Sequence, residues 1–234
     1  MLLLVTDTSG KSGFVALVRA AEDARTKAVE AIEEVPLAGG TFSAQLVPQI
    51  AGLLTKHGIS KTEMDAFIVV SGPGSFTGLR VGLAAIKALA EILHKPIVPV
   101  SLLEVLAVAS GVSGRVLAAL DAGRGEVFVG EYTISTEAAV LVGERLLTKQ
   151  DFVAASQGGS VATNDEGLAQ MANGSAQHVS LVSVDAVKIA SLGVRRLLAG
   201  DSVSPEQLDA NYIRRSDAEI FFRPNPGKPY LAKP

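Results

Sequence analysis

Two turns that begin with aspartate are the first places in this 234-residue chain where side chains and backbone could do chemistry together. Asp7-Thr8-Ser9-Gly10 and Asp121-Ala122-Gly123-Arg124-Gly125 each follow an apolar run, which predicts a hairpin turn at the end of a buried strand. Two such turns could hold phosphate and a magnesium ion, but aspartate is also common in turns for backbone reasons. Arg124 would bind phosphate in the first case and could pair with Glu126 in the second.

A glycine-rich loop, Gly72-Pro73-Gly74-Ser75-Phe76-Thr77-Gly78, follows a predicted strand and opens a helix, the setting in which backbone N–H groups bind phosphate. Its spacing departs from the Rossmann fingerprint, because three residues instead of two separate the second and third glycines. It departs from the P-loop as well, because a leucine and an arginine follow Gly78. The loop has no Gly-x-Ser-x-Gly elbow that would make Ser75 a nucleophile. We therefore expect a tight structural turn.

The residue types that the chain lacks exclude several kinds of site. With no cysteine, the chain cannot form disulfides, thiolate metal sites or a cysteine nucleophile. Its three histidines, His57, His94 and His178, are too far apart in the sequence to hold a metal on one helical face. We therefore expect no catalytic residue, no cofactor and no metal in this chain. A net charge of −3, with 5% aromatic residues and no tryptophan, argues against an RNA-binding module.

The apolar runs are short for a chain in which 48% of residues are hydrophobic. A run such as that over residues 66–70 is far below the roughly 20 residues that a membrane span needs. The first residues carry no basic segment and reach Asp7 too early for a signal peptide. The sequence thus predicts a cytoplasmic protein with no membrane contact.

Strands, turns and helices at the observed spacing predict a mixed α/β sheet. Strands are predicted over residues 2–5, 13–19, 26–35, 66–70, 97–100, 116–120 and 126–133. Helices are predicted over residues 43–57 with Ser43 as N-cap, up to His94 after the glycine-rich loop, from Ser101 to 110, and over 185–199 with Asp185 as N-cap. The strand–turn–strand pattern after residue 111 repeats the one at the N-terminus. Residues 134–184 show no clear pattern.

The long helix that ends near His94 is unusually apolar. Its polar side chains, Arg80, Lys87, Glu91 and His94, share one narrow stripe at 100° per residue. Either the helix is enclosed within its own domain, or it buries one face on a partner. For the second case we expect an interface built from this helix and the one before it: Leu46, Ile50, Leu53, Phe76, Leu79, Gly82, Ala85, Ile86 and Leu89.

The C-terminal segment combines arginines with aromatic residues: Arg214, Arg215 and Arg223 with Tyr212, Phe221 and Phe222. These residues could contact RNA phosphates and bases. Alternatively, the segment packs on its own domain or on a partner.

Together, these segments resemble the TsaB/YeaZ family. The run over residues 71–82 is similar to that family's most specific signature, and Asp7-Thr8-Ser9 matches in order and spacing. Residues 120–127 and Asn211-Tyr212-Ile213-Arg214-Arg215 resemble two further family segments. The resemblance implies an actin-like (ASKHA) α/β fold with two related subdomains, residues 1–104 and 105–234, the second smaller and degenerate.

The resemblance also implies a function. It implies a non-catalytic scaffold or activator of tRNA threonylcarbamoyladenosine synthesis that binds a catalytic TsaD-like paralogue through the two apolar helices. A TsaE-like ATPase is a further partner, and tRNA is met only through the complex. A homodimer in the absence of the paralogue, and a nucleotide at the shared interface, both stay open. The main rival is an autonomous actin-like ATPase or small-molecule kinase, which the two aspartate-led turns favour. A glycoprotease-type hydrolase would need a metal ion or an activated nucleophile, and the sequence offers neither.

Overall fold

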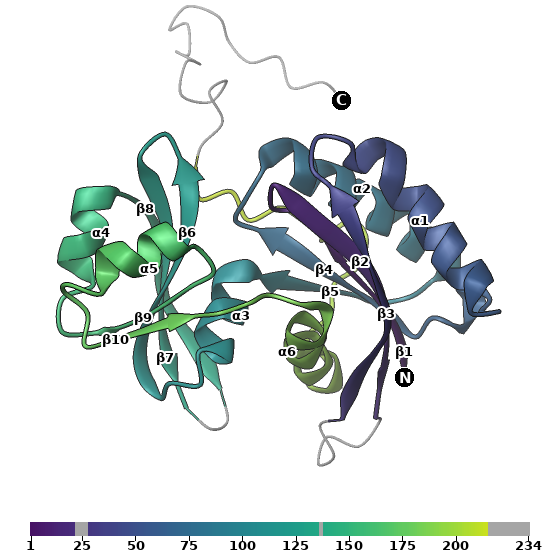
Figure 1. Ribbon diagram of the computed structural model, residues 1–234. Coiled ribbons are helices and arrows are strands. Elements are labelled where there is room, and N and C mark those ends of the chain that lie inside the picture. The colour runs from purple at the N-terminus through teal and green to yellow at the C-terminus, as the bar shows by residue number, and fades with distance from the viewer. Residues whose placement is uncertain (22–27, 136–137, 215–234) are drawn as a thin grey trace, which may run out of the picture.

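The computed structural model describes residues 1–21, 28–135 and 138–214 (Figure 1). The first elements are β1 (Leu2–Asp7), β2 (Ser12–Ala20), β3 (Val29–Ala38), α1 (Phe42–Lys56), the short 3-10 helix η1 (Lys61–Glu63), β4 (Ala66–Gly72), α2 (Phe76–Leu93), β5 (Ile97–Ser101) and α3 (Leu102–Ala109). The chain continues with β6 (Gly114–Gly123), β7 (Glu126–Ile134), β8 (Ala139–Thr148), α4 (Lys149–Ala155), β9 (Ser160–Thr163), α5 (Glu166–Ala172), β10 (His178–Leu181) and α6 (Ala186–Leu198).

The two five-stranded sheets repeat one topology. The first has the order β3-β2-β1-β4-β5, and the second, read in the same direction, has the order β8-β7-β6-β9-β10. In each sheet the first three strands pair antiparallel and the last two join in parallel. A helix follows the third, fourth and fifth strand of each half. The prediction of a mixed α/β fold with two related subdomains is confirmed. The repeat covers all five strands of each sheet, whereas the sequence showed only the strand–turn–strand pattern.

The second half is the smaller one, as predicted. Its helices α4 and α5 have 7 residues each, whereas α1 and α2 have 15 and 18. Its parallel strands β9 and β10 have 4 residues each. These elements lie in the segment over residues 134–184, where the sequence showed no clear pattern, because elements of four to seven residues are too short to display a periodicity.

The third helix of each half packs against the other half's sheet. Helix α3 lies mainly on β6 and β7, and α6 lies under β1, β2, β3 and β5 (Figure 1). One hydrophobic core therefore joins both sheets, with Val5 and Val100 from the first and Val116 and Phe128 from the second. The subdomain boundary after residue 104 stays a prediction. Helix α6 belongs to the second subdomain by its place in the chain, but it packs against the first sheet.

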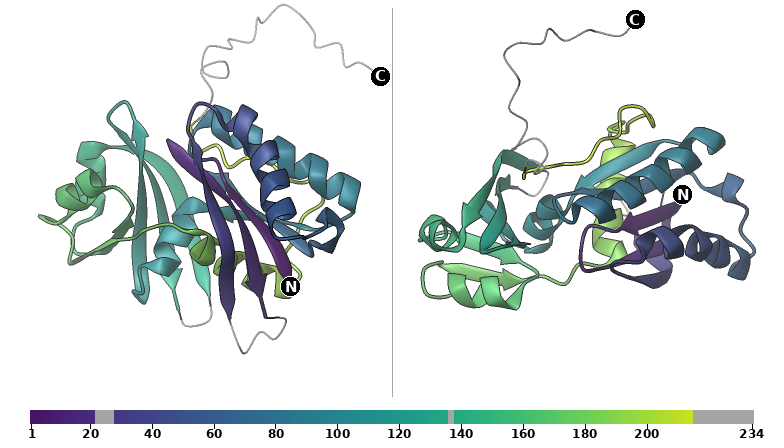
Figure 2. Two further views of the ribbon diagram at one scale, coloured as in Figure 1. Left: turned by 45° about the vertical axis from the view of Figure 1, so that its right-hand side comes forward. Right: turned by 90° about the horizontal axis from the view of Figure 1, so that it is seen from above.

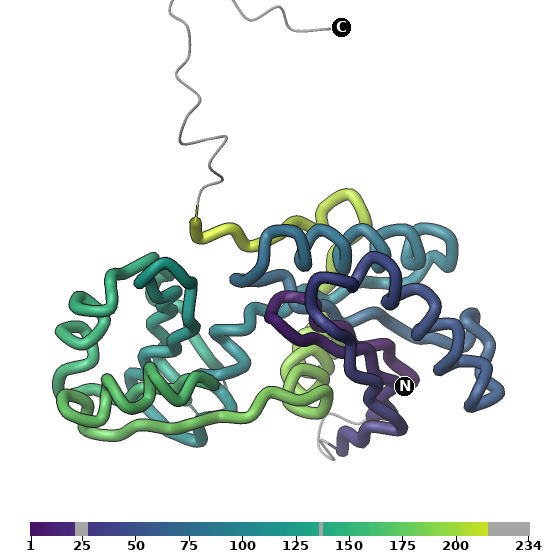
Figure 3. The backbone as a smooth tube through the Cα atoms, turned by 45° about the horizontal axis from the view of Figure 1, so that its top comes forward, coloured from purple at the N-terminus to yellow at the C-terminus, as the bar shows by residue number. Residues whose placement is uncertain are grey.

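Helices α1 and α2 cover the outer face of the first sheet, and α4 and α5 cover the outer face of the second (Figure 2). Separate apolar clusters lie beneath each pair. No helix in the described ranges is both long and apolar enough to cross a membrane. After α6 the chain returns across the molecule: Val203 bridges Ile97 at the edge of the first sheet, and residues 208–214 then run toward the second (Figure 3).

Some predicted boundaries need correction. Helix α1 begins at Phe42, and Thr41 rather than Ser43 precedes it as N-cap. The third strand begins at Val29, so it lies a few residues later than predicted, and residues 26 and 27 are outside the described ranges. The N-cap of α6 is Asp185, as predicted, because its side chain accepts a hydrogen bond from the Lys188 N–H.

Candidate functional site

The glycine-rich loop lies directly on the first aspartate-led turn. The Ser75 N–H donates to the Ser9 carbonyl at 2.7 Å, and the Thr8 hydroxyl donates to the Gly78 carbonyl at 2.8 Å. A Cβ at Gly74 would lie 2.3 Å from the Ser9 carbonyl oxygen, and one at Gly78 would lie 2.1 Å from that of Thr8. The glycines are therefore needed because two backbone segments touch, and the loop is the tight structural turn that its spacing predicts.

The side chain of Asp7, the first residue of this turn, is buried. It accepts hydrogen bonds from the Ser9 N–H at 2.8 Å and from the Ser9 hydroxyl at 2.6 Å. Burial raises the pKa of Asp7, and the two bonds from Ser9 oppose that rise. Asp7 thus fixes the conformation of its turn through Ser9, and Ser9 and Gly10 line the cleft described next.

A cleft of about 1020 Å³ lies between the two halves of the molecule. It is lined by the first turn, the glycine-rich loop, the second turn and the C-terminal segment. Its charged lining residues are Lys11, Arg80, Asp121, Arg124 and Arg214. These are four cations and one carboxylate, and Glu126 offsets the charge of Arg214, which leaves the lining net positive although the chain as a whole is acidic.

Two of the cationic side chains of the cleft are held by aromatic rings. Arg80 lies 3.7 Å from the centre of the Phe76 ring and donates to the Tyr212 hydroxyl at 3.2 Å. Arg214 lies over the Phe128 ring and pairs with Glu126, the predicted partner of Arg124.

Part of the C-terminal segment therefore packs on its own chain. Tyr212 and Arg214 are the aromatic and basic residues of the segment that make these contacts. Arg215 and residues 221–223 lie outside the described residues.

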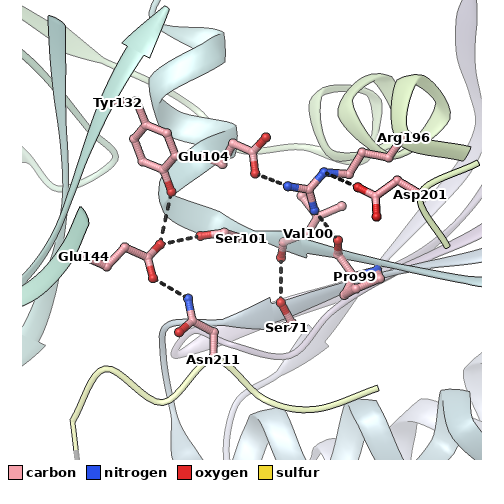
Figure 4. Close-up of polar contacts among 10 residues, drawn as sticks. All are labelled: Ser71, Pro99, Val100, Ser101, Glu104, Tyr132, Glu144, Arg196, Asp201 and Asn211. Atoms are coloured by element: carbon pink, nitrogen blue, oxygen red, sulfur yellow. Dashed lines mark hydrogen bonds and ion pairs between the residues drawn. The ribbon is translucent and has the colours of Figure 1, made fainter. Parts of the chain in front are cut away.

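A polar cluster at the seam between the halves is centred on Glu144 of β8 (Figure 4). Its carboxylate accepts hydrogen bonds from the Ser101 hydroxyl at 3.1 Å, the Tyr132 hydroxyl at 3.1 Å and the Asn211 side-chain amide at 2.6 Å. The Asn211 N–H also donates to the Ser71 carbonyl at 2.8 Å. Glu144 thus joins the first sheet, the second sheet and the C-terminal segment.

A second cluster beside it joins α3 and α6. Arg196 pairs with Glu104 and donates to the Pro99 carbonyl at 2.6 Å. Burial raises the pKa of Glu104, and the Arg196 charge opposes that rise. Sequence patterns did not predict either cluster, apart from Asn211 in a family segment, because residues so far apart meet only after folding.

The predicted interface residues need a correction. Six of them are buried in the single chain: Leu46, Ile50, Leu53, Leu79, Gly82 and Ile86. Leu46, Ile50, Leu53 and Ile86 belong to the apolar cluster beneath α1 and α2, Gly82 lies against Thr8 of the first turn, and Leu79 lies beside Gly72. Ala85 and Leu89 are half-buried, and Phe76 is at the cleft under Arg80.

Exposed apolar residues nevertheless remain on α1 and α2, among exposed polar ones such as Gln49, Thr55 and Glu91. Away from Phe76 at the cleft, the exposed apolar residues are Ala44, Val47, Pro48, Ala51 and Gly52 on α1, and Ala84, Ala88 and Ile92 on α2. Val47 is 58% exposed and Ile92 is 69% exposed. We call these eight residues the helical face. Helical periodicity predicted that α2 has too little polar surface, but it placed the partner-facing side on residues that the sheet covers.

The histidine and carboxylate side chains do not gather in one place. Within the described ranges no group of three or more His, Asp or Glu residues could hold a metal ion. His57 Nε2 lies 2.7 Å from a Glu33 carboxylate oxygen, and Lys56 pairs with the same carboxylate.

Comparisons with known proteins point to one family. Residues 36–199 match the family model described as "TsaD: tRNA N6-adenosine threonylcarbamoyltransferase". The chain is 34% identical to the tRNA threonylcarbamoyladenosine biosynthesis protein TsaB of Bacillus subtilis, over 56% of this chain and 55% of that one. An uncharacterized protein of Mycobacterium leprae is 30% identical over 80% of this chain and 48% of its own length. The chain spans about half the length of these curated relatives.

Two solved structures resemble this chain over most of its length. YeaZ from Pseudomonas aeruginosa is 25% identical, with a TM-score of 0.68 over 90% of this chain and 100% of that one. A second Pseudomonas aeruginosa structure, described as similar to peptidase YeaZ, is 27% identical with a TM-score of 0.71, over 91% of this chain and 99% of that one. The duplicated topology and these likenesses confirm the actin-like fold. The chain therefore belongs to the TsaB/YeaZ family, within the group of sequences that the TsaD model matches.

Proposed function

We propose that this chain is a non-catalytic subunit of the machinery that makes tRNA threonylcarbamoyladenosine, and that it binds a TsaD-like paralogue through the helical face. The observation that carries the proposal is the exposed apolar surface of α1 and α2, on a chain whose relatives are named for this pathway. Small residues such as Ala84 and Ala88 let a partner helix approach closely. Contiguous exposed apolar surface of this kind typically marks an interaction site.

The charge distribution supports a central apolar contact with a polar rim. Arg80 and Glu91 flank the helical face on α2, and Lys56 lies at the end of α1. Charged residues are depleted at the centre of protein interfaces and accepted at their edges. We expect the contact to bury a total of about 1,200–2,000 Å².

The first turn supports a role without catalysis by this chain. In a phosphate-binding turn, the leading carboxylate would face the cleft, whereas the carboxyl group of Asp7 is buried and bonded to Ser9. The catalytic step is therefore assigned to the paralogue. A TsaE-like ATPase and tRNA would join through the assembled complex, and the free chain would pair with a second copy through the same helical face. The cytoplasm is the compartment that this role requires.

A matched pair of variants tests the interface. Ala88→Arg places a cation in the centre of the helical face, where an unpaired buried charge is costly to binding. Ala154→Arg makes the same change at an exposed position of α4, on the other half of the molecule. Calorimetric titration of the TsaD-like paralogue should show binding by the native chain and by Ala154→Arg, and none by Ala88→Arg. Equal binding by both variants would assign the interface to another surface.

The cleft favours a second candidate function, an autonomous actin-like ATPase or small-molecule kinase. Its lining carries the cations Lys11, Arg80, Arg124 and Arg214, and it lies between the two aspartate-led turns. Both activities require that the isolated chain bind ATP; an ATPase then releases phosphate, whereas a kinase transfers the phosphoryl group to an acceptor. Titration of the isolated chain with ATP and magnesium tests both, and a phosphate-release assay tests the ATPase.

A further inference from the structure

The segment over residues 208–214 connects the two halves of the molecule, and we call it the strap. The duplicated topology ends with α6, so the strap is an addition to the repeat. Leu208 anchors its start, because this side chain is buried in the apolar cluster beneath α1 and α2. Its end lies on the second half, where Arg214 pairs with Glu126 of β7. The strap therefore crosses the seam between the halves (Figure 3).

Asn211 of the strap is bonded to both halves at once. Its backbone N–H donates to the Ser71 carbonyl at 2.8 Å, near the end of β4. Its side-chain amide donates to the Glu144 carboxylate of β8 at 2.6 Å (Figure 4). Asn211 and Glu144 are both half-buried, so the loss of either partner is costly to the other. One residue thus bridges the two sheets.

The residues after Asn211 are attached to opposite halves. The centre of the Tyr212 ring lies 4.9 Å from that of the Phe76 ring, and the Tyr212 hydroxyl accepts a hydrogen bond from Arg80 at 3.2 Å. Both of these partners are on α2 of the first half. Two positions later, Arg214 pairs with Glu126 at the start of β7 in the second half.

The strap and the helices that join the halves lie on opposite sides of the seam. Figure 1 shows α3 and α6 on its lower side and the strap on its upper side. The cleft is on the side of the strap, because residues 211–214 line it together with both aspartate-led turns. Two halves that are joined on one side can rotate about that join and change the width of the cleft. With the strap on the other side, such a rotation has to break its contacts.

We propose that residues 208–214 act as a strap that holds the two halves of the free chain at one separation across the cleft. The strap also engages two cations of the cleft, Arg80 through Tyr212 and Arg214 through Glu126. A ligand that needs the cleft to close around it has to displace these contacts first. The strap acts within one chain, and it does so whether or not the helical face binds a paralogue.

A distance measurement across the seam tests the proposal in the full-length chain. Because the chain has no cysteine, Gln49→Cys on α1 and Gln150→Cys on α4, both at exposed positions, can carry one spin label on each half. Asn211→Ala combined with Arg214→Ala removes both links from the strap to the second half and leaves Tyr212 on the first. The matched control is Asp209→Ala, an exposed residue of the same strap whose carboxylate accepts from the neighbouring Ala210 N–H.

Pulsed electron paramagnetic resonance should give one narrow distance distribution in the native chain and in Asp209→Ala. In the double variant the distribution should broaden, or shift by several ångströms, while circular dichroism shows the same helix content. An equally narrow, unshifted distribution in the folded double variant would mean that the shared core and the Ser101–Glu144 hydrogen bond fix the halves without the strap. A broad distribution in the native chain would contradict the proposal as well.

Hydrogen exchange in the native chain tests the strap without any substitution, so a double variant that fails to fold leaves the proposal testable. The Asn211 amide, which is bonded to the Ser71 carbonyl, should exchange at least severalfold more slowly than the same amide in an unstructured peptide. Exchange at the rate of the peptide would show that the strap is detached in solution, and it would overturn the proposal.

Discussion

The two halves of the molecule share one chain order but differ in the helices that cover their outer faces. Helices α1 and α2 have 15 and 18 residues, and their exposed residues include alanines, Val47 and Ile92 among polar side chains. Helices α4 and α5 have 7 residues each. Burying one sheet face requires only the inner stripe of a helix. The longer pair has exposed apolar residues on its outer stripe too, which is the reason for placing the proposed partner contact on the first half.

The largest expected effect separates the inner and outer stripes of one helix. Ile86 is fully buried beneath α2, whereas Ile92 on the same helix is 69% exposed. Ile86→Ala should lower the free energy of unfolding by about 2–5 kcal/mol, and Ile92→Ala should change it by no more than about 0.5 kcal/mol. Denaturant titration of the two variants measures the difference. If Ile92→Ala proved as destabilising as Ile86→Ala, the outer stripe would belong to the core of the single chain.

A pair of glycines should sharpen the same distinction between packed and open surfaces. A Cβ at Gly78 would meet the Thr8 carbonyl at 2.1 Å, whereas one at Gly52 of α1 would meet nothing within 4 Å. Gly78→Ala should cost about 1–3 kcal/mol through overpacking. Gly52→Ala should stabilise the free chain by up to about 1 kcal/mol, because alanine favours helix more than glycine does. Thermal unfolding of both variants is the measurement, and a stable Gly78→Ala protein would contradict the close contact.

The seam between the halves should respond no more strongly than the Gly78 contact. Glu144→Ala leaves the Tyr132 hydroxyl and the Asn211 amide without their acceptor, at a cost of about 1–3 kcal/mol. Its neighbour Arg145 is partly exposed and 3.6 Å from Glu131, so Arg145→Ala should cost less than about 1 kcal/mol. Chemical denaturation compares them. Equal costs would mean that the Glu144 cluster does not hold the halves together.

The smallest expected effect is a pH dependence that originates in the first turn. The pKa of Asp7 is raised by burial, so the folded state keeps its proton at a pH where the unfolded chain has lost it. Stability from this group is therefore present below the unfolded value of about 3.9 and declines as pH rises through the folded pKa. Asp7→Asn, which cannot ionise, should lose this decline. Denaturant titrations between acid and neutral pH give the comparison, and parallel pH profiles for both proteins would refute it.

The repeated strand patterns and the turns could be predicted because their signals are local. Apolar runs and the turns between them marked all five strands of the first half and the first two of the second, and a capping aspartate marked α6. The short elements over residues 134–184 could not be predicted, since four to seven residues carry too little pattern.

The candidate interface was predicted largely on residues that are buried within the single chain. Large apolar side chains such as Leu46 and Ile50 are the ones that a sheet buries, and the exposed apolar residues of the same helices include four alanines, Val47 and Ile92. Sequence alone does not show which side of an apolar helix faces its sheet. The Glu144 cluster was missed because its members meet only in the folded chain.

The most direct test of the scaffold role is tRNA modification in a reconstituted mixture. Threonylcarbamoyladenosine is measured by mass spectrometry with this chain omitted, added, added as Ala88→Arg, or present as the only protein. Modification should require the native chain and the TsaD-like paralogue together, and it should fall to background with Ala88→Arg. Modification by this chain alone, or undiminished modification in its absence, would contradict the account.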